Sequence, residues 1–208
     1  MRITNKHVFW LKVLMHVIAL LPIIYLVLAV LSEAAGGDPV QYIIHYTGIG
    51  ALNTLLIMLC ISPIAKKFKQ GALIQTRRLI GLYVFAYATL HLMAFVSLDL
   101  LFEWSLFLQE TVKRPYIVIG TVAYLLLLAL SITSFNVIKR KMGKRWQQLH
   151  NSVYLVAVLV PVHFFWSVKS EIIEPSIYIT VTALLLFARK DQIKRIFKRL
   201  NSHNKCNF

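Results

Sequence analysis

The sequence has few charged side chains and few cysteines. Only 15% of its 208 residues are charged and 58% are hydrophobic, whereas soluble domains are about 45–50% apolar even when glycine is counted. The two cysteines, Cys60 and Cys206, form no CxxC or Cys/His zinc pattern and have no paired spacing. No internal repeat or low-complexity segment is detectable. These features exclude a soluble domain and a disulfide or thiolate framework, and they indicate an integral membrane protein.

Acidic residues are also scarce, with 8 Asp and Glu against 23 Lys and Arg and a net charge of +15. Such a balance can indicate nucleic-acid binding. Here the basic residues stand in short blocks between apolar runs, a pattern that reports topology in a membrane protein. We therefore expect contact with membrane lipid and no nucleic-acid partner.

Six apolar runs predict membrane crossings through a hydrocarbon core about 30 Å thick. The second is expected to end at Ser62 and Pro63, and the sixth is short. The runs cover residues 9–31, 45–62, 79–101, 114–135, 149–168 and 176–189. The sequence thus predicts an all-α integral membrane protein, a bundle of six transmembrane helices in which residues 1–208 form a single domain.

The distribution of charge predicts the orientation. All Lys and Arg except Lys113, Arg114 and Lys169 fall on one side of the predicted bundle, together with both ends of the chain. All acids except Asp191 fall on the other side. Because basic loops stay in the cytoplasm, we expect both termini to face the cytoplasm.

Histidines inside the apolar runs are the main candidates for function, since ionisable groups at membrane depth are costly. His91 and His163 lie roughly 18 Å and 21 Å from the inner ends of two runs that cross in the same direction. Two neutral imidazoles at matching depth can hold a heme iron axially inside a helical bundle. Aromatic residues of the same runs could line the ring: Tyr83, Phe85, Tyr87, Phe95, Tyr154, Phe164, Phe165 and Trp166.

Other roles for these histidines stay open. A single histidine in a membrane helix can serve only as a hydrogen-bond partner of a carbonyl or hydroxyl. Zinc is less well supported, because the sequence offers imidazoles without an HExxH motif or a carboxylate-rich helix. His45, at the outer end of the second run, could take up a proton, contact a quinone or a partner, or simply lie at the interface.

His150 lies at the inner boundary of the fifth run, beside Gln147, Gln148 and Asn151. It is roughly 20 Å from His163 along the helix, which suits a second site at another depth. On an ideal helix the two side chains would point roughly 140° apart, so a local rewinding is needed to turn both inward. Pro161 is expected to supply it.

Basic residues surround this inner level. Arg77 lies nearly on the same helix face as His91. A histidine at this position would complete a second pair with His150, but the sequence has an arginine there. Arg77 and Arg78, together with Lys144 and Arg145, instead predict an electropositive rim. Such a rim suits a flavin phosphate or anionic lipid headgroups, and it is also the ordinary signature of a cytoplasmic loop.

Several motifs carry a family resemblance over essentially the whole chain. They are TRRLIGL at 76–82, ATLHL ending at Leu92, RPY at 114–116, GKRWQQLHN at 143–151 and PVHFFWSVK at 161–169. These motifs resemble the MsrQ family, formerly YedZ, the heme-binding membrane subunits of bacterial protein-methionine-sulfoxide reductases. More loosely, they resemble the ferric-reductase-like transmembrane superfamily, in which histidines of the third and fifth spans hold stacked hemes.

The resemblance implies a heme b subunit with His91, His150 and His163 as heme ligands, and with FMN as a further cofactor. Electrons would come from the quinone pool or a cytoplasmic flavin reductase and pass to MsrP, a periplasmic molybdenum enzyme that repairs oxidised methionines. Relative to the oxidases of the superfamily, Arg77 replaces a histidine, which argues against a symmetrical second heme.

Two other functions are compatible with part of the pattern. A histidine-containing proton or metal transporter would need a polar path of buried ionisable groups, and the span centres hold few such groups besides histidine. A membrane anchor for a periplasmic partner would need no cofactor. Visible absorption by heme separates the electron carrier from both.

Overall fold

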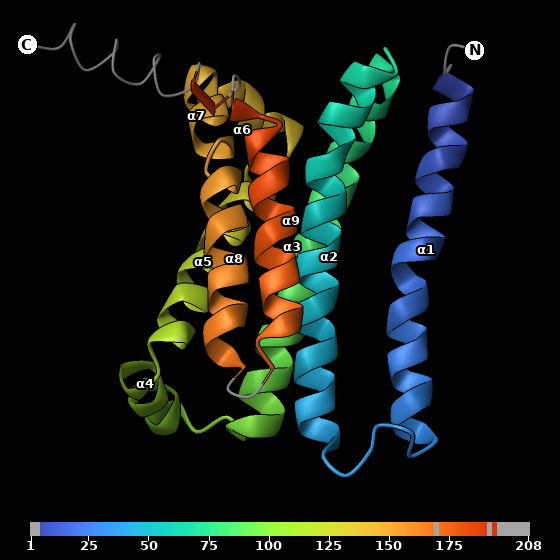
Figure 1. Cartoon of the computed structure of the whole chain (residues 1–208). Helices are drawn as coiled ribbons and strands as arrows, with labels where there is room; N and C mark the ends of the chain where they lie inside the picture. The colour runs from blue at the N-terminus through green and yellow to red at the C-terminus, as the bar shows by residue number, and fades with distance from the viewer. Residues whose placement is uncertain (1–4, 169–170, 191–192, 195–208) are drawn as a thin grey trace, which may run out of the picture.

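The computed structural model describes residues 5–168, 171–190 and 193–194, all of them in helices, turns and connecting segments without a strand (Figure 1). The other residues lie outside this description. They include Lys169, Asp191 and most of the basic tail. The helices are α1 (Asn5–Leu31), α2 (Pro39–Lys67), η1 (Gly71–Thr76), α3 (Arg77–Ala94), η2 (Phe95–Asp99), α4 (Trp104–Lys113), α5 (Pro115–Ile132), α6 (Asn136–Met142), α7 (Lys144–His150), α8 (Val153–Ser167) and α9 (Ile173–Phe187).

Five helical segments of the described chain are long and apolar enough to cross a membrane. They are Lys6–Leu31, Pro39–Lys67, Gly71–Asp99, Pro115–Ile132 and Lys144–Ser167, and the apolar helix Ile173–Phe187 is shorter. The expectation of a multi-pass all-α membrane protein is therefore confirmed. In Figure 1, α1 begins and α9 ends at the same end of the bundle, where α6 and α7 also lie.

The second helix is longer at both ends than the sequence predicted. Asp38 caps its start by accepting a hydrogen bond from the Gln41 amide at 3.0 Å, and Pro39 occupies the first turn, where proline is tolerated. The expected end at Pro63 was wrong, because the helix continues to Lys67. Pro63 cannot donate to the Leu59 carbonyl, and a guanidinium N–H of Arg189 bonds that carbonyl instead.

The fifth predicted crossing is not one continuous helix. It divides into α7, ending at His150, and α8, beginning at Val153. At the junction the Ser152 amide bonds the Leu149 carbonyl at 2.9 Å, a tighter turn than the α-helical pattern. This break lies between His150 and His163, where the sequence predicted a local rewinding. Pro161 lies inside α8, and its part in such a rewinding stays a prediction.

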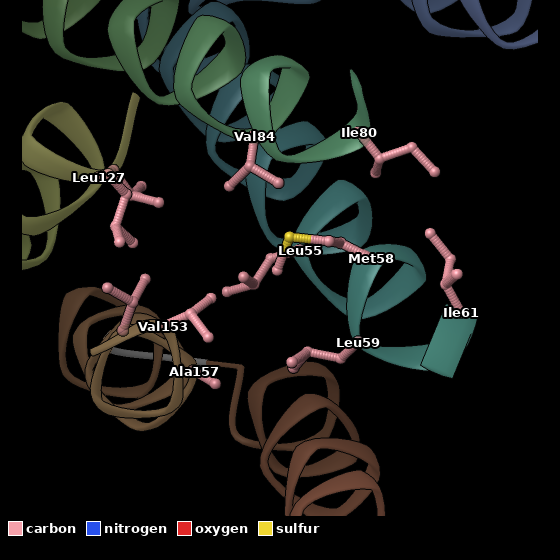
Figure 2. Packing of buried hydrophobic residues seen from close by; sticks show 11 residues of the cluster. Leu55, Met58, Leu59, Ile61, Ile80, Val84, Leu127, Val153 and Ala157 are labelled. Carbon is pink, nitrogen blue, oxygen red and sulfur yellow. The ribbon is translucent and has the colours of Figure 1, made fainter. Parts of the chain in front are cut away.

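The core forms where α2, α3, α5 and α8 meet, and Figure 2 shows its side chains converging from these helices. Leu55 of α2, Val84 of α3, Leu127 of α5 and Val156 of α8 are all buried there. In Figure 1, α1 lies at the edge of the bundle, and its Met15 packs against the core cluster. Two polar contacts link α1 to α3: His16 Nδ1 lies 2.6 Å from the Tyr83 hydroxyl, and Tyr87 donates to the Ala19 carbonyl.

Candidate functional site

His91 on α3 and His163 on α8 are both held by a backbone carbonyl. The Nδ1 atom of His91 lies 2.9 Å from the carbonyl oxygen of Ile44, and that of His163 lies 2.7 Å from the carbonyl oxygen of Tyr116. A carbonyl only accepts, so Nδ1 must carry the proton that each hydrogen bond uses. In the neutral imidazole the lone pair is then on Nε2, the arrangement found in metal-ligating histidines with a backbone partner.

The two imidazoles lie against each other at one level of the bundle. Their ring centroids are 6.2 Å apart and their planes are nearly perpendicular, at 84°. Two metal–nitrogen bonds of about 2 Å, plus about 1.1 Å from each nitrogen to its ring centre, place the centroids of two axial imidazoles about 6 Å apart. The observed separation of the centroids is thus of the size expected for two imidazoles that hold one metal ion. The two rings also lie close together, as their matching depths along the sequence suggested.

A glycine on a neighbouring helix makes room for each imidazole. A Cβ atom at Gly120 of α5 would lie 2.8 Å from Cε1 and Nδ1 of His163, and one at Gly48 of α2 would lie 3.1 Å from the same atoms of His91. Any side chain at Gly120 would therefore displace the ring. Sequence reasoning did not identify either glycine, because a helical glycine has no pattern that reveals which side chain it faces.

The two histidines occupy equivalent places in two helical hairpins, one of α2 and α3 and the other of α5 with α7 and α8. In both hairpins the histidine lies 47 residues after the carbonyl that holds it. The same alignment pairs Gly48 with Gly120, Leu55 with Leu127 and Val84 with Val156. The hairpins thus form a pseudo-symmetric pair, which the sequence alone did not reveal because few residues are identical.

Not all of the aromatic residues expected around the pair point toward it. The ring of Tyr116, whose carbonyl binds His163, lies 6.0 Å from that imidazole. Tyr83 and Tyr87 instead bond to α1. Phe165 and Trp166 are among the exposed side chains. The site is therefore bounded by backbone carbonyls and glycines more than by the aromatic residues named from the sequence.

His45 lies at the same end of α2 as Ile44 and contacts two other elements. Its Nε2 atom is 3.9 Å from a carboxylate oxygen of Glu174 on α9, and its ring centroid is 5.8 Å from that of Phe164. Both partners of this ion pair are partly exposed. The contact with Glu174 was not among the roles expected for His45, and those roles stay predictions.

His150 is the last residue of α7 and lies away from the other two histidines, near the end of the bundle where α6 and α7 are found. Its Nε2 atom is 3.0 Å from the Thr133 hydroxyl, and its ring stacks on Trp146 with centroids 4.0 Å apart. Trp146 in turn donates to the Thr133 carbonyl. In the hairpin alignment the position equivalent to His150 is Arg78. The role of His150 as a heme ligand stays a prediction.

Replacing His150 with alanine is expected to leave a cofactor held by His91 and His163 in place. His150 meets Thr133 and Trp146, whereas His91 and His163 are held by the carbonyls of Ile44 and Tyr116. The measurement is the low-spin heme spectrum of the purified variant, with Thr133→Val as a milder disturbance of the same level. A loss of the outer signal as complete as in His163→Ala would contradict the independence of the two levels.

The predicted rim arginines point in different directions. Arg78 is exposed and donates to the Asn136 side chain of α6 at 3.1 Å. Arg77 is half-buried, and its Nε atom is buried without a hydrogen-bond partner among the described residues. The structure therefore separates an outward-facing Arg78 from an inward-facing Arg77.

Within the described part of the chain, no group of three or more His, Cys, Asp or Glu side chains is placed to hold a metal ion. Two axial nitrogens are enough for a heme, since the porphyrin supplies the other four. Helices long and apolar enough to span a membrane, with two paired imidazoles at one depth, are typical of the membrane components of electron-transfer systems.

Comparison with known families agrees with this class. The family described as ferric reductase like transmembrane component matches residues 47–161, more than half of the sequence. The matched segment contains Gly48, His91, Gly120 and His150, and it ends just before His163. The chain belongs to the ferric reductase like transmembrane family.

Proposed function

We propose that the chain is a heme b subunit that carries electrons across the membrane, with His91 and His163 as axial ligands. The observation that carries the proposal is the facing pair of imidazoles, each with Nδ1 bonded to a backbone carbonyl. Zinc at the pair is less well supported, because within the described chain no three His, Cys, Asp or Glu side chains are grouped so that they could hold a metal ion.

The bound iron would supply one-electron redox chemistry between ferric and ferrous states. The protein's part is to orient the ligands and set their basicity. The carbonyls of Ile44 and Tyr116 fix the tautomer of each imidazole and, by accepting the Nδ1 proton, make Nε2 a stronger donor to a metal. Gly48 and Gly120 leave room for the two rings between the helices.

We further propose an MsrQ-like role for this carrier, on the strength of the five sequence motifs. Electrons would enter at the inner level from the quinone pool or a cytoplasmic flavin reductase, and leave at the periplasmic side to MsrP, which reduces methionine sulfoxide. This role requires six crossings in a bacterial inner membrane with both termini in the cytoplasm. The basic residues around α6 and α7 favour that orientation.

The same proposal includes FMN as a further cofactor and a ligand role for His150. His150 would contact heme or flavin at the inner level, where it already meets Thr133 and Trp146. Arg77 and Arg78 would contact the flavin phosphate, because guanidinium groups bind phosphate through paired hydrogen bonds.

The proposal is tested by purifying the full chain from heme-replete cells and measuring heme per polypeptide as the pyridine hemochrome. We expect stoichiometric heme b that is reduced by a cytoplasmic flavin reductase or quinol and reoxidised by MsrP with methionine sulfoxide. Heme that is reduced but not reoxidised by MsrP would contradict MsrP as the partner, while the role as an electron carrier would stand. A polypeptide without heme would contradict the role as an electron carrier and favour a transporter.

A further inference from the structure

The short connection between α4 and α5 lies at the end of the bundle opposite α6 and α7 (Figure 1). It consists of Arg114, which precedes Pro115 in the first turn of α5. The Nε atom of Arg114 is 2.5 Å from a carboxylate oxygen of Glu110 on α4, and its Nη1 atom donates to the Tyr116 hydroxyl at 3.2 Å. The guanidinium is therefore held in place from both helices.

Tyr116 connects this guanidinium to the imidazole pair. Its carbonyl oxygen lies 2.7 Å from Nδ1 of His163, and its ring centroid lies 6.0 Å from that of the same imidazole. Its hydroxyl accepts the hydrogen bond from Arg114. A single tyrosine thus contacts both His163 and Arg114, and Arg114 is within the reach of a group as large as a heme held at the pair.

Arg114 keeps donors available for a further partner. A guanidinium carries five N–H donors in a planar fork, and among the described residues those of Arg114 meet only Glu110 and Tyr116. The side chain is 49% exposed, so its other donors are accessible. The only other Lys or Arg residues predicted at this end are Lys113 and Lys169, among mostly acidic side chains. Arg114 is therefore a fixed cation at an otherwise acidic end of the bundle.

A heme b held by His91 and His163 brings two propionate carboxylates into the bundle, and a carboxylate is costly to leave in hydrocarbon. Along the axis of α8, His163 lies roughly 6 Å before the end at Ser167 and roughly 15 Å after the start at Val153. The nearer boundary is thus at the end where Arg114 lies. Guanidinium groups bind carboxylates there through paired, charge-assisted hydrogen bonds, whereas acidic side chains repel them.

We propose that Arg114 binds a propionate group of the heme that His91 and His163 hold, while Glu110 and the Tyr116 hydroxyl keep the guanidinium in place. The inference rests on the heme binding proposed above and adds a residue that sets the orientation of the heme. Two axial bonds alone leave a heme free to turn about the axis through its ligands. A charged contact at its rim fixes that rotation.

The experiment titrates the heme-depleted full chain with hemin and with hemin dimethyl ester, in which both propionates are esterified and carry no charge. Arg114→Gln removes the guanidinium, and Arg114→Lys keeps the charge without the planar fork. Lys113→Gln is the matched control. It removes the neighbouring positive charge, and the exposed Lys113 side chain makes no ion pair or hydrogen bond within the described chain.

We expect Arg114→Gln to bind hemin about tenfold more weakly than the wild type does, since hydrogen bonds between charged groups are among the strong ones. The same variant should bind the dimethyl ester as tightly as the wild type, because the ester offers no charge to lose. Arg114→Lys should fall between the two for hemin, and Lys113→Gln should match the wild type for both ligands. The midpoint potential of Arg114→Gln should be lower, because losing a nearby positive charge favours ferric heme.

Equal hemin affinities of Arg114→Gln and the wild type would overturn the proposal, as would an equal loss in Lys113→Gln or a wild type that binds hemin and its ester alike. If Arg114→Gln weakened both ligands equally, Arg114 would act only by holding α4 against α5, and the proposal would fall as well. In all of these outcomes the wild type still binds heme. A wild type that binds no hemin would instead contradict the proposed function, and the role of Arg114 with it.

Discussion

Replacing either His91 or His163 with alanine is expected to abolish heme binding at the outer level while the chain still inserts into the membrane. Each substitution removes one of two axial nitrogens, and the remaining imidazole cannot hold the iron in a six-coordinate low-spin state. The measurement is heme per polypeptide and the reduced-minus-oxidised spectrum of purified variants, with insertion followed by membrane fractionation.

The matched controls are His16→Ala and His45→Ala. Each removes a histidine that lies within or at the boundary of the membrane and whose partner is not a residue of the His91–His163 pair. His16 bonds Tyr83, and His45 faces Glu174. Both controls are expected to keep heme. Wild-type heme content in His91→Ala and His163→Ala alike would eliminate the ligand assignment, whatever the behaviour of the controls.

The second large effect is expected at a residue that makes no bond to the cofactor. In Gly120→Ala the new methyl group would lie 2.8 Å from the His163 ring, closer than the two can approach. The His163 ring is hydrogen-bonded to the Tyr116 carbonyl. To avoid the methyl group, the ring must therefore move or lose that hydrogen bond. We expect about a tenfold loss of heme affinity, as for other groups that orient a metal ligand.

Hemin titration of the heme-depleted proteins measures this loss. Gly48→Ala should cost less, because its methyl group would lie at 3.1 Å from His91. Gly81→Ala is the control, since a Cβ there makes only an ordinary contact of 3.4 Å with the Met58 sulfur. If Gly120→Ala binds hemin as tightly as Gly81→Ala, the close approach at His163 is not needed for the site.

Several features of the site could be predicted from the sequence because they depend on position along a helix. The rise per residue of an α-helix places His91 and His163 at one depth, and the structure brings their rings together. Long apolar runs likewise predicted the multi-pass helical architecture.

Other features depend on contacts between distant segments and could not be predicted. Pro63 normally marks a helix end, yet α2 continues because Arg189 satisfies the carbonyl that the proline frees. The break at Asn151 and Ser152 carries no helix-breaking residue, so it was not expected.

The most direct test of the central claim is the electron paramagnetic resonance spectrum of the oxidised wild-type protein. Two axial imidazoles with planes near 84° predict a low-spin ferric signal of the strongly anisotropic kind that perpendicular imidazole planes produce. The signal should vanish in both His91→Ala and His163→Ala. A purely high-spin ferric signal in the wild type, or a colourless protein from heme-replete cells, would contradict the account.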